Sequence, residues 1–264
     1  MKKTILLTLT LIAFLQLTFA QKTPTQLKKK MTLQMPRKAE DEFSGTRGAA
    51  VVWNPKTKRY YASYAGNGGF PMAVFTKKGK RVSNDDLTTQ MDTRGLWYNK
   101  NNNQIEGNAY SDNGWFYYEL DKEGIPTTIQ TIFEGMYQPD EQSFGMYNPI
   151  DNMVFFKGED NLVSIYNRET GEEADLLYLY KGDDEDEIDF SQYRSSIVIV
   201  DGELGLLNDQ IMQIDFFSDK NGKHTRSAKL PEGTKIADLL SFSYANGYIW
   251  ILDDETRSWN GFKL

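Results

Sequence analysis

The chain has 264 residues, no cysteine, one histidine, 13% aromatic residues and a formal net charge of −7. The absence of cysteine excludes disulfides, a thiolate nucleophile and Cys-ligated zinc, and any mechanism that needs an imidazole would have to use His224. The mean hydropathy of −0.57 and the acidic balance argue against a membrane protein and against binding to nucleic acid. The composition is therefore that of an acidic globular protein rich in aromatic residues.

Residues 1–20 have the pattern of a secretory signal peptide. Lys2 and Lys3 precede an apolar stretch over residues 5–17, and Thr18-Phe19-Ala20 is an acceptable cleavage site. A transmembrane anchor is the alternative, but the apolar stretch is short and contains polar residues. We therefore expect export, with residues 21–264 as the mature chain, secreted or periplasmic, with a net charge of about −9.

The mature chain consists of short β-branched and aromatic runs separated by turn residues, and helical periodicity is nearly absent, which predicts an all-β protein. An apolar strand that ends in an Asn-led turn recurs at intervals of about 45 to 50 residues. The three clearest copies are Val52-Trp53-Asn54-Pro55, Trp97-Tyr98-Asn99-Lys100 and Met146-Tyr147-Asn148-Pro149.

Each copy continues with a second strand, a polar turn and a third strand that ends in a glycine turn, at Gly79, Gly124 and Gly171. The third strand of the first unit is predicted over residues 70–75. A fourth unit keeps its closing glycine at Gly222, and a fifth begins near Ser241. The fifth unit is one strand short at the C-terminus, and residues 30–35 have the alternation of the missing fourth strand. Pairing the two ends would close the repeat and leave no exposed edge.

These features predict a β-propeller of five four-stranded blades as a single domain over residues 21–264. The chain resembles the superfamily of secreted β-propellers with NHL, YVTN or SMP-30-like repeats, on turn and core residues only. A sixth blade is the alternative if the N-terminal segment and the acidic insertion at residues 183–187 hold extra strands. A β-sandwich or barrel would not explain the repeat.

Arginine recurs directly before three of the predicted innermost strands, as Arg47, Arg94 and Arg194. Three guanidinium groups at one channel mouth would bind a carboxylate, sulfate or phosphate group. The competing interpretation, which we favour, is that each arginine pairs with an acid of its own loop. The nearby acids are Asp41 or Glu42, Asp92 and Asp189.

Turns on the same predicted face carry acids, of which Asp112, Asp160 and Asp209 are candidates for ligand or Ca²⁺ binding. An SMP-30-like lactonase would need such oxygen ligands in a metal cage. No loop has a complete calcium-binding pattern, and runs of acids are usually solvated loops. We therefore expect no metal or other cofactor, with Ca²⁺ as the weaker alternative.

Aromatic side chains could stack on sugar rings. Trp53, Trp97, Trp115 and Trp250 fall inside strands and are expected to pack between blades. Trp259, Tyr137 and Tyr193 are better candidates for exposed contacts, and His224 is expected on the surface away from the site.

The sequence thus favours an exported, monomeric, non-catalytic binding module whose ligand is a glycan, a small anion or a protein. The alternative is a carbohydrate-active hydrolase with paired carboxylates, or a metal-dependent lactonase.

Overall fold

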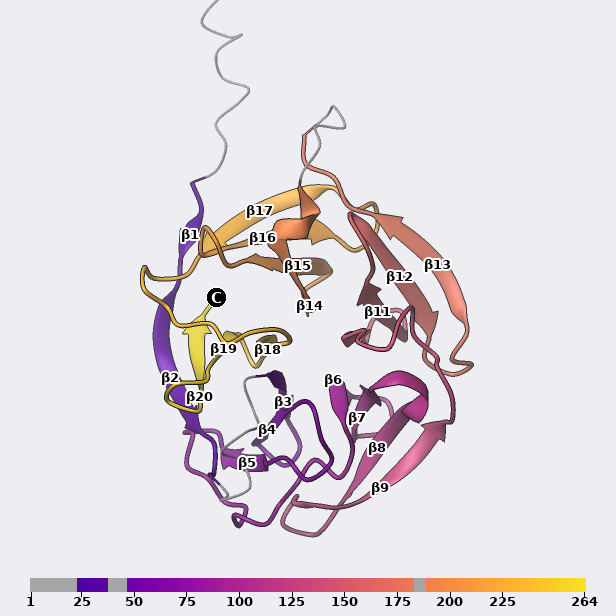
Figure 1. Cartoon of the computed structure of the whole chain (residues 1–264), viewed down its shortest axis with the longest axis vertical. Helices are drawn as coiled ribbons and strands as arrows, with labels where there is room; N and C mark the ends of the chain where they lie inside the picture. Colours follow the sequence, from indigo (N-terminus) through magenta and orange to yellow (C-terminus); the bar gives the residue numbers. More distant parts are fainter. Residues whose placement is uncertain (1–22, 38–46, 183–188) are drawn as a thin grey trace, which may run out of the picture.

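The computed structural model describes residues 23–37, 47–182 and 189–264. The predicted signal peptide at residues 1–20, the acids Asp41 and Glu42, and the acidic insertion at residues 183–187 lie outside these ranges. Five β-sheets stand around a common centre and form a five-bladed β-propeller, as the sequence predicted (Figure 1). A sixth blade is not formed by the described residues. No helix in them is long and apolar enough to cross a membrane.

The blades follow one another along the chain, each with its first strand innermost. The first blade holds β3 (Gly48–Asn54), β4 (Arg59–Tyr64) and β5 (Met72–Thr76). The second holds β6 (Thr93–Asn99), β7 (Gln104–Ala109), β8 (Trp115–Leu120) and β9 (Pro126–Phe133). The third holds β10 (Gly145–Asn148), β11 (Met153–Lys157), β12 (Leu162–Asn167) and β13 (Glu173–Tyr178). The fourth holds β14 (Tyr193–Val200), β15 (Glu203–Asn208), β16 (Gln213–Ser218) and β17 (His224–Lys229). The fifth holds β18 (Phe242–Ala245), β19 (Tyr248–Asp253) and β20 (Ser258–Lys263).

The repeated turns have the conformations that their residues favour. The side-chain oxygen of Asn54 accepts hydrogen bonds from the backbone of Lys56 (2.9 Å) and Thr57 (3.2 Å), and Asn148 likewise accepts one from Ile150 (3.0 Å). An asparagine side chain that bonds its own backbone two residues on stabilises such a turn. The closing glycines have positive φ, for example +81° at Gly79, which other residues adopt at a cost.

The N-terminal strand closes the ring. β2 (Lys28–Gln34) pairs with β20 in antiparallel register as the outer strand of the fifth blade, which confirms the prediction made for residues 30–35. The short strand β1 (Thr25–Gln26) pairs in parallel with β17 of the fourth blade. One segment therefore holds two blades together, and in Figure 1 it runs along the left side of the ring.

The first blade departs from the prediction of four strands, because its sheet contains only β3, β4 and β5. The next segment touches β5 at an isolated bridge between Phe75 and Arg81, and Pro71 forms another with Thr88. Between these points Ser83 Oγ, rather than a backbone carbonyl, accepts the hydrogen bond of Val74 N (3.0 Å). β5 also begins two residues later than predicted.

Aromatic side chains fill the spaces between the strands and blades. Trp115 and Trp250 are fully buried, and Trp97 is 3% exposed, as the sequence predicted. Trp259 is fully buried too, which makes its proposed role as an exposed contact wrong; it lies in β20, directly paired with β2. Tyr137 is half-buried, with its ring 5.0 Å from that of Phe133.

Candidate functional site at the centre of the loop face

The loops that lead into the inner strands lie on the same face as the turns between second and third strands. Ala65 N donates a hydrogen bond to Arg47 O (3.0 Å), and Tyr110 N donates one to Asp92 O (2.8 Å), each joining such a turn to such a loop. We call this side the loop face. Its described turns are residues 65–71, 110–114, 158–161, 209–212 and 254–257, and its described loop residues include 87–92, 134–144, 189–192 and 230–241.

All three predicted arginines stand where an inner strand is irregular. The β6–β7 register shifts between Thr93 and Gly95, at Arg94. The β14–β15 register shifts between Tyr193 and Ile197, around Arg194, and the β3–β4 register shifts just after Arg47. A bulge bends a strand and changes the direction of its side chains.

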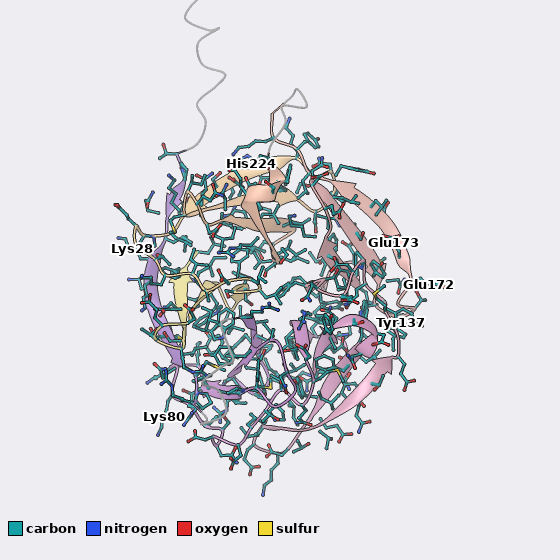
Figure 2. All side chains as sticks on the ribbon, in the orientation of Figure 1. Lys28, Lys80, Tyr137, Glu172, Glu173 and His224 are labelled. Carbon is teal, nitrogen blue, oxygen red and sulfur yellow. The ribbon has the colours of Figure 1, made fainter. Side chains whose placement is uncertain are left out.

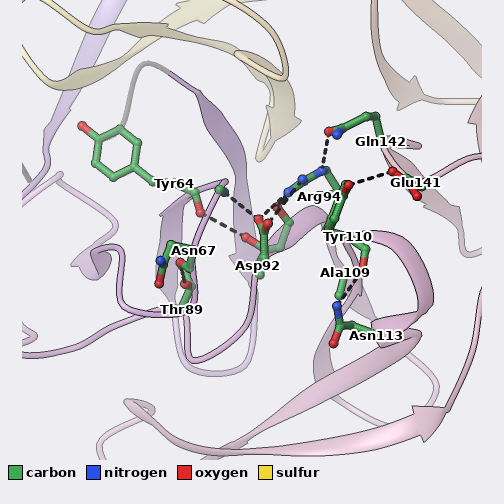
Figure 3. Close-up of polar contacts among 12 residues, drawn as sticks. Tyr64, Asn67, Thr89, Asp92, Arg94, Ala109, Tyr110, Asn113, Glu141 and Gln142 are labelled. Atoms are coloured by element: carbon green, nitrogen blue, oxygen red, sulfur yellow. Dashed lines mark hydrogen bonds and ion pairs between the residues drawn. The ribbon is translucent and has the colours of Figure 1, made fainter. Parts of the chain in front are cut away.

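Arg94 is neutralised and almost fully buried, with 2% of its surface exposed. Its guanidinium group forms an ion pair with Asp92 and donates through Nε to Gln142 Oε1 (3.0 Å), as Figure 3 shows. The group also stacks on the ring of Tyr110 at 4.7 Å. A guanidinium group that is already paired, stacked and buried is held as part of the scaffold.

Tyr110 extends this network outward. Its hydroxyl donates to Glu141 Oε2 (2.7 Å), and this hydrogen bond, together with the charge of Glu141, raises the pKa of Tyr110 above its ordinary value. Glu141 and Gln142 are both exposed and belong to the loop before β10. The second and third blades therefore present one connected polar surface.

A buried amide pair underneath fixes these two blades. Asn108 Oδ1 accepts from the backbone N–H groups of Gly95 and Gly145, both at 3.0 Å, and so joins two inner strands. Asn108 Nδ2 donates to Gln138 Oε1 (2.6 Å). The inner strands touch here, because a Cβ on Gly95 would lie 2.1 Å from Gly145 O. This pair was not predicted, and the signal for it in the sequence is an amide, Asn108, between two small residues at the end of β7.

Arg194 pairs with Asp209 through an Nη2–Oδ2 contact of 2.5 Å, rather than with its sequence neighbour Asp189. Asp189 instead caps the short 3-10 helix η3 (Phe190–Gln192) by accepting from Ser191 N. Two donors beside the Arg194 pair are buried and find no acceptor among the described residues: Arg194 Nε and Ser196 Oγ. Buried donors without a partner are rare in folded proteins.

Arg47 differs from the other two arginines. It is half-buried, and within residues 23–37, 47–182 and 189–264 no carboxylate lies within ion-pair distance of its guanidinium group. Arg94 thus has the acid partner from its own loop that the competing interpretation predicted, whereas Arg194 pairs with an acid of a different turn and Arg47 has no partner among the described acids. The three do not form a set of free cations.

Asp112 and Asp160 do not converge on the arginines or on each other. Asp112 is exposed in the 3-10 helix η2 (Ser111–Asn113), and Asp160 is exposed in the turn between β11 and β12. Among the described residues no three His, Asp or Glu side chains are grouped so that they could hold a metal ion. The lactonase-like metal cage therefore has no counterpart in the described part of the loop face.

Tyr193 is not an exposed loop residue, as the sequence suggested, but the buried first residue of β14, with 9% of its surface exposed. Its hydroxyl donates to Asp215 Oδ2 at 2.6 Å. Burial and the neighbouring carboxylate both raise the pKa of Tyr193 well above its usual range. Tyr193 therefore supports the blade rather than contacting a ligand.

His224 is half-buried in β17, where the sequence led us to expect a surface position. Its Nε2 lies 3.2 Å from Asp215 Oδ1 and 3.1 Å from Ser227 Oγ. A Ser-His-Asp relay needs the serine and the carboxylate on different ring nitrogens. Both groups here contact Nε2, so the arrangement is a hydrogen-bond cluster within the blade, not a catalytic triad.

Comparisons with known proteins agree on the fold and no further. The structure is similar to that of a glutaminyl cyclase from Myxococcus xanthus, with a TM-score of 0.53 and 6% identity over 91% of this chain and 98% of that one. A Bacteroides thetaiotaomicron protein of unknown function gives a TM-score of 0.49 with 10% identity, over 82% of this chain and 59% of that one. AztD from Citrobacter koseri gives 0.33 with 11% identity, over 70% and 48% of the two chains. No family model and no curated protein sequence matches the chain.

The fold and the loop face define a five-bladed β-propeller. At 6% identity the likeness to glutaminyl cyclase concerns the fold alone. The NHL, YVTN or SMP-30-like identity stays a prediction.

Proposed function

We propose that the chain is an exported, monomeric binding module that holds a ligand at the centre of its loop face. The ligand presents a carboxylate or another planar anionic group and belongs to a glycan, a small anion or a protein. Rigid blades with binding groups on their loops are the usual basis of recognition in this architecture.

The proposal rests on the difference between Arg47 and the other two arginines, Arg94 and Arg194, which have carboxylate partners. Arg94 and Arg194 are neutralised by Asp92 and Asp209, whereas Arg47 has no carboxylate partner among the described residues. A half-buried guanidinium group gains most from a bidentate anion, because desolvation makes an unpaired charge costly.

Two further groups of side chains support the same face. Arg194 Nε and Ser196 Oγ are buried donors without an acceptor in the described residues, so the polar groups at the start of β14 are incompletely paired. The turns and loops of the same face also carry three large apolar side chains, Met136, Ile211 and Leu239, which are 54%, 50% and 43% exposed. Polar donors with apolar neighbours suit a protein side chain or a sugar ring.

Hydrolysis by paired carboxylates is less well supported. Asp219 is a carboxyl group whose pKa is raised by burial, as a general acid requires, but it follows β16, where its N–H bonds Gly202 O on the side opposite the loop face. It therefore does not stand beside Arg47. The carbohydrate-active hydrolase and the lactonase remain the second candidates, on the acids of the loop face alone.

The test is a glycan and metabolite binding screen on residues 21–264, with and without EDTA, followed by titration of each hit against Arg47→Ala. We expect the variant to bind about tenfold more weakly or worse, because one charge-assisted bidentate contact is lost.

Lys56→Ala is the control, since it removes an exposed positive charge from the turn between β3 and β4 of the same blade. Equal loss in both variants would argue against a site at Arg47. Turnover of a glycan or lactone hit would replace the binding proposal with the enzyme alternative.

A further inference from the structure

Charge is distributed very unevenly around this acidic protein. Residues 47–84, which form the first blade and its closing turn, contain eight basic residues and no acidic one. Residues 23–37, which include β2, contain four basic residues and again no acid. β2 belongs to the fifth blade, which is the neighbour of the first, so these two segments make one sector of the ring positive.

The exposed members of this sector lie on two segments that pack against each other. Lys28, Lys29 and Lys30 are exposed at the start of β2, and Lys77, Lys78 and Lys80 are exposed on the turn after β5. That turn packs on β2, because a Cβ on Gly79 would lie 3.2 Å from Thr32 O. We call these six lysines the basic rim. In Figure 2, Lys28 and Lys80 lie on one side of the ring, and the acidic Glu172 and Glu173 lie on the other.

A groove of about 390 Å³ opens beside the basic rim. Its apolar floor includes Met35 and Phe75, and its walls include Arg37 and Arg81. It lies between the end of β2, the end of β5 and the segment after β5, in the blade that lacks a regular fourth strand. Arg81 pairs with the exposed Asp85 at 2.5 Å, whereas Arg37 has no acceptor among the described residues.

We infer that the basic rim and its groove dock an acidic, extended polypeptide segment that inserts one apolar side chain between Arg37 and Arg81. Charge complementarity argues for an acidic partner, since this sector is positive in a chain whose net charge is −7. The groove argues for a polypeptide rather than a flat anionic surface, because it has apolar residues beside its charges and one arginine, Arg37, that has no acid partner among the described residues, whereas Arg81 is paired with Asp85. This surface is separate from the site at Arg47.

The experiment measures binding of a fluorescent peptide of glutamate residues with one central phenylalanine to residues 21–264 at low and physiological ionic strength. Comparison probes are the same peptide with glycine in place of phenylalanine, a lysine counterpart, and vesicles of anionic phospholipid. We expect binding of the first peptide that weakens with salt, weaker binding of the glycine peptide, and no binding of the lysine peptide.

Lys77→Glu/Lys78→Glu should weaken binding about tenfold or more, and Arg37→Ala should remove the advantage of phenylalanine over glycine. Lys100→Glu/Lys122→Glu, which changes net charge equally on exposed turns of the second blade, should have little effect. Thermal unfolding of each variant verifies that the fold is kept.

Equal loss in both double variants would overturn the proposal in favour of net charge alone. Binding of vesicles but not of peptide, with the same dependence on Lys77 and Lys78, would identify a lipid surface instead. Absence of any binding would mean that the lysines only protect an edge strand from association.

Discussion

The third blade meets its two neighbours through very different polar contacts. Towards the second blade, Arg168 donates to both oxygens of the fully buried Glu106, at 2.6 and 2.8 Å. Towards the fourth blade, Asn148 Nδ2 bridges Asp219 Oδ2 (2.9 Å) and Asp151 Oδ2 (3.2 Å), which places two carboxylates around one amide.

At the junction of the second and third blades every buried charge has an opposite charge or a hydrogen-bond donor as partner. We call this the matched junction, and the junction of the third and fourth blades, where two carboxylates share one amide, the unmatched junction. Glu106 also accepts from Trp97 Nε1 (3.0 Å) and from the side chains of Asn99 and Asn102 (3.1 and 2.7 Å). Burial, with a contribution from Asp151, raises the pKa of Asp219 despite Lys220 and Asn148. A raised carboxyl pKa in this fold can therefore arise from an incompletely matched junction, away from the loop face, and does not by itself mark a catalytic acid.

The largest effect is expected at the matched junction. Glu106→Gln removes the charge that neutralises Arg168, and we expect the free energy of unfolding in urea to fall by about 3–5 kcal/mol. The double variant Glu106→Gln/Arg168→Met should regain much of that loss, because no buried charge is left unpaired. A single-variant loss below about 1 kcal/mol would contradict this account of the junction.

Asp215, inside the fourth blade, is a buried carboxylate matched mainly by hydrogen bonds, with Lys181 Nζ 3.5 Å from its Oδ1. Burial raises its pKa, but hydrogen bonds from His224, Ser227 and Tyr193 outweigh burial, so the pKa of Asp215 lies below its usual range. Its stabilisation is present above the ordinary aspartate pKa of about 3.9 and is lost as the pH falls below it. Asp215→Asn should cost about 1–3 kcal/mol at pH 7.

In the same variant the free energy of unfolding should fall less steeply as the pH is lowered. This dependence is measured by urea unfolding from neutral pH down to the lowest pH at which the protein folds. Parallel curves for wild type and Asp215→Asn below about pH 4 would show that Asp215 does not carry this dependence.

The smallest effect on stability is expected at the unmatched junction, where substitution should stabilise the protein instead of destabilising it. Because the folded pKa of Asp219 is raised, its contribution to stability is present below the ordinary aspartate pKa and is lost as the pH rises through the folded value. Asp219→Asn keeps an acceptor for Asn148 and should stabilise the protein at pH 7 by about 0.5–1 kcal/mol. Thermal unfolding at pH 7 and pH 4 should show the gain only at the higher pH; a loss at pH 7 would refute the comparison.

The fold was predictable because its signals are local. Asn54, Asn99 and Asn148 end the inner strands in the turns that the repeat indicated, and Gly79 marks one of the closing turns. Ring closure was also predictable, since the alternation at residues 30–35 matched the strand that the fifth blade lacked. The missing fourth strand of the first blade was not, because residues 81–88 meet β5 through isolated bridges, scattered backbone hydrogen bonds and the Ser83 side chain rather than through a regular ladder.

The contacts of the site were less predictable because most of its partners come from elsewhere in the chain. Asp92 is two residues from Arg94 and was named as a partner, whereas Asp209 reaches Arg194 from the turn after β15. Glu106 left a usable signal, a charged residue at a buried strand position, but nothing near it indicates Arg168, 62 residues away.

The pairing of β2 with β20 sets an order on folding. Thr32 Oγ1 donates to Asn260 Oδ1 across 228 residues of sequence, so the strand that is synthesised early cannot find its partner until the last blade exists. Pairing over such a separation is slow, because loop-closure entropy must be overcome first. Until then the outer edge of β20 and the lysine-rich N-terminal strand are both unpaired, and lysines on an unpaired strand are a feature that disfavours pairing with other chains.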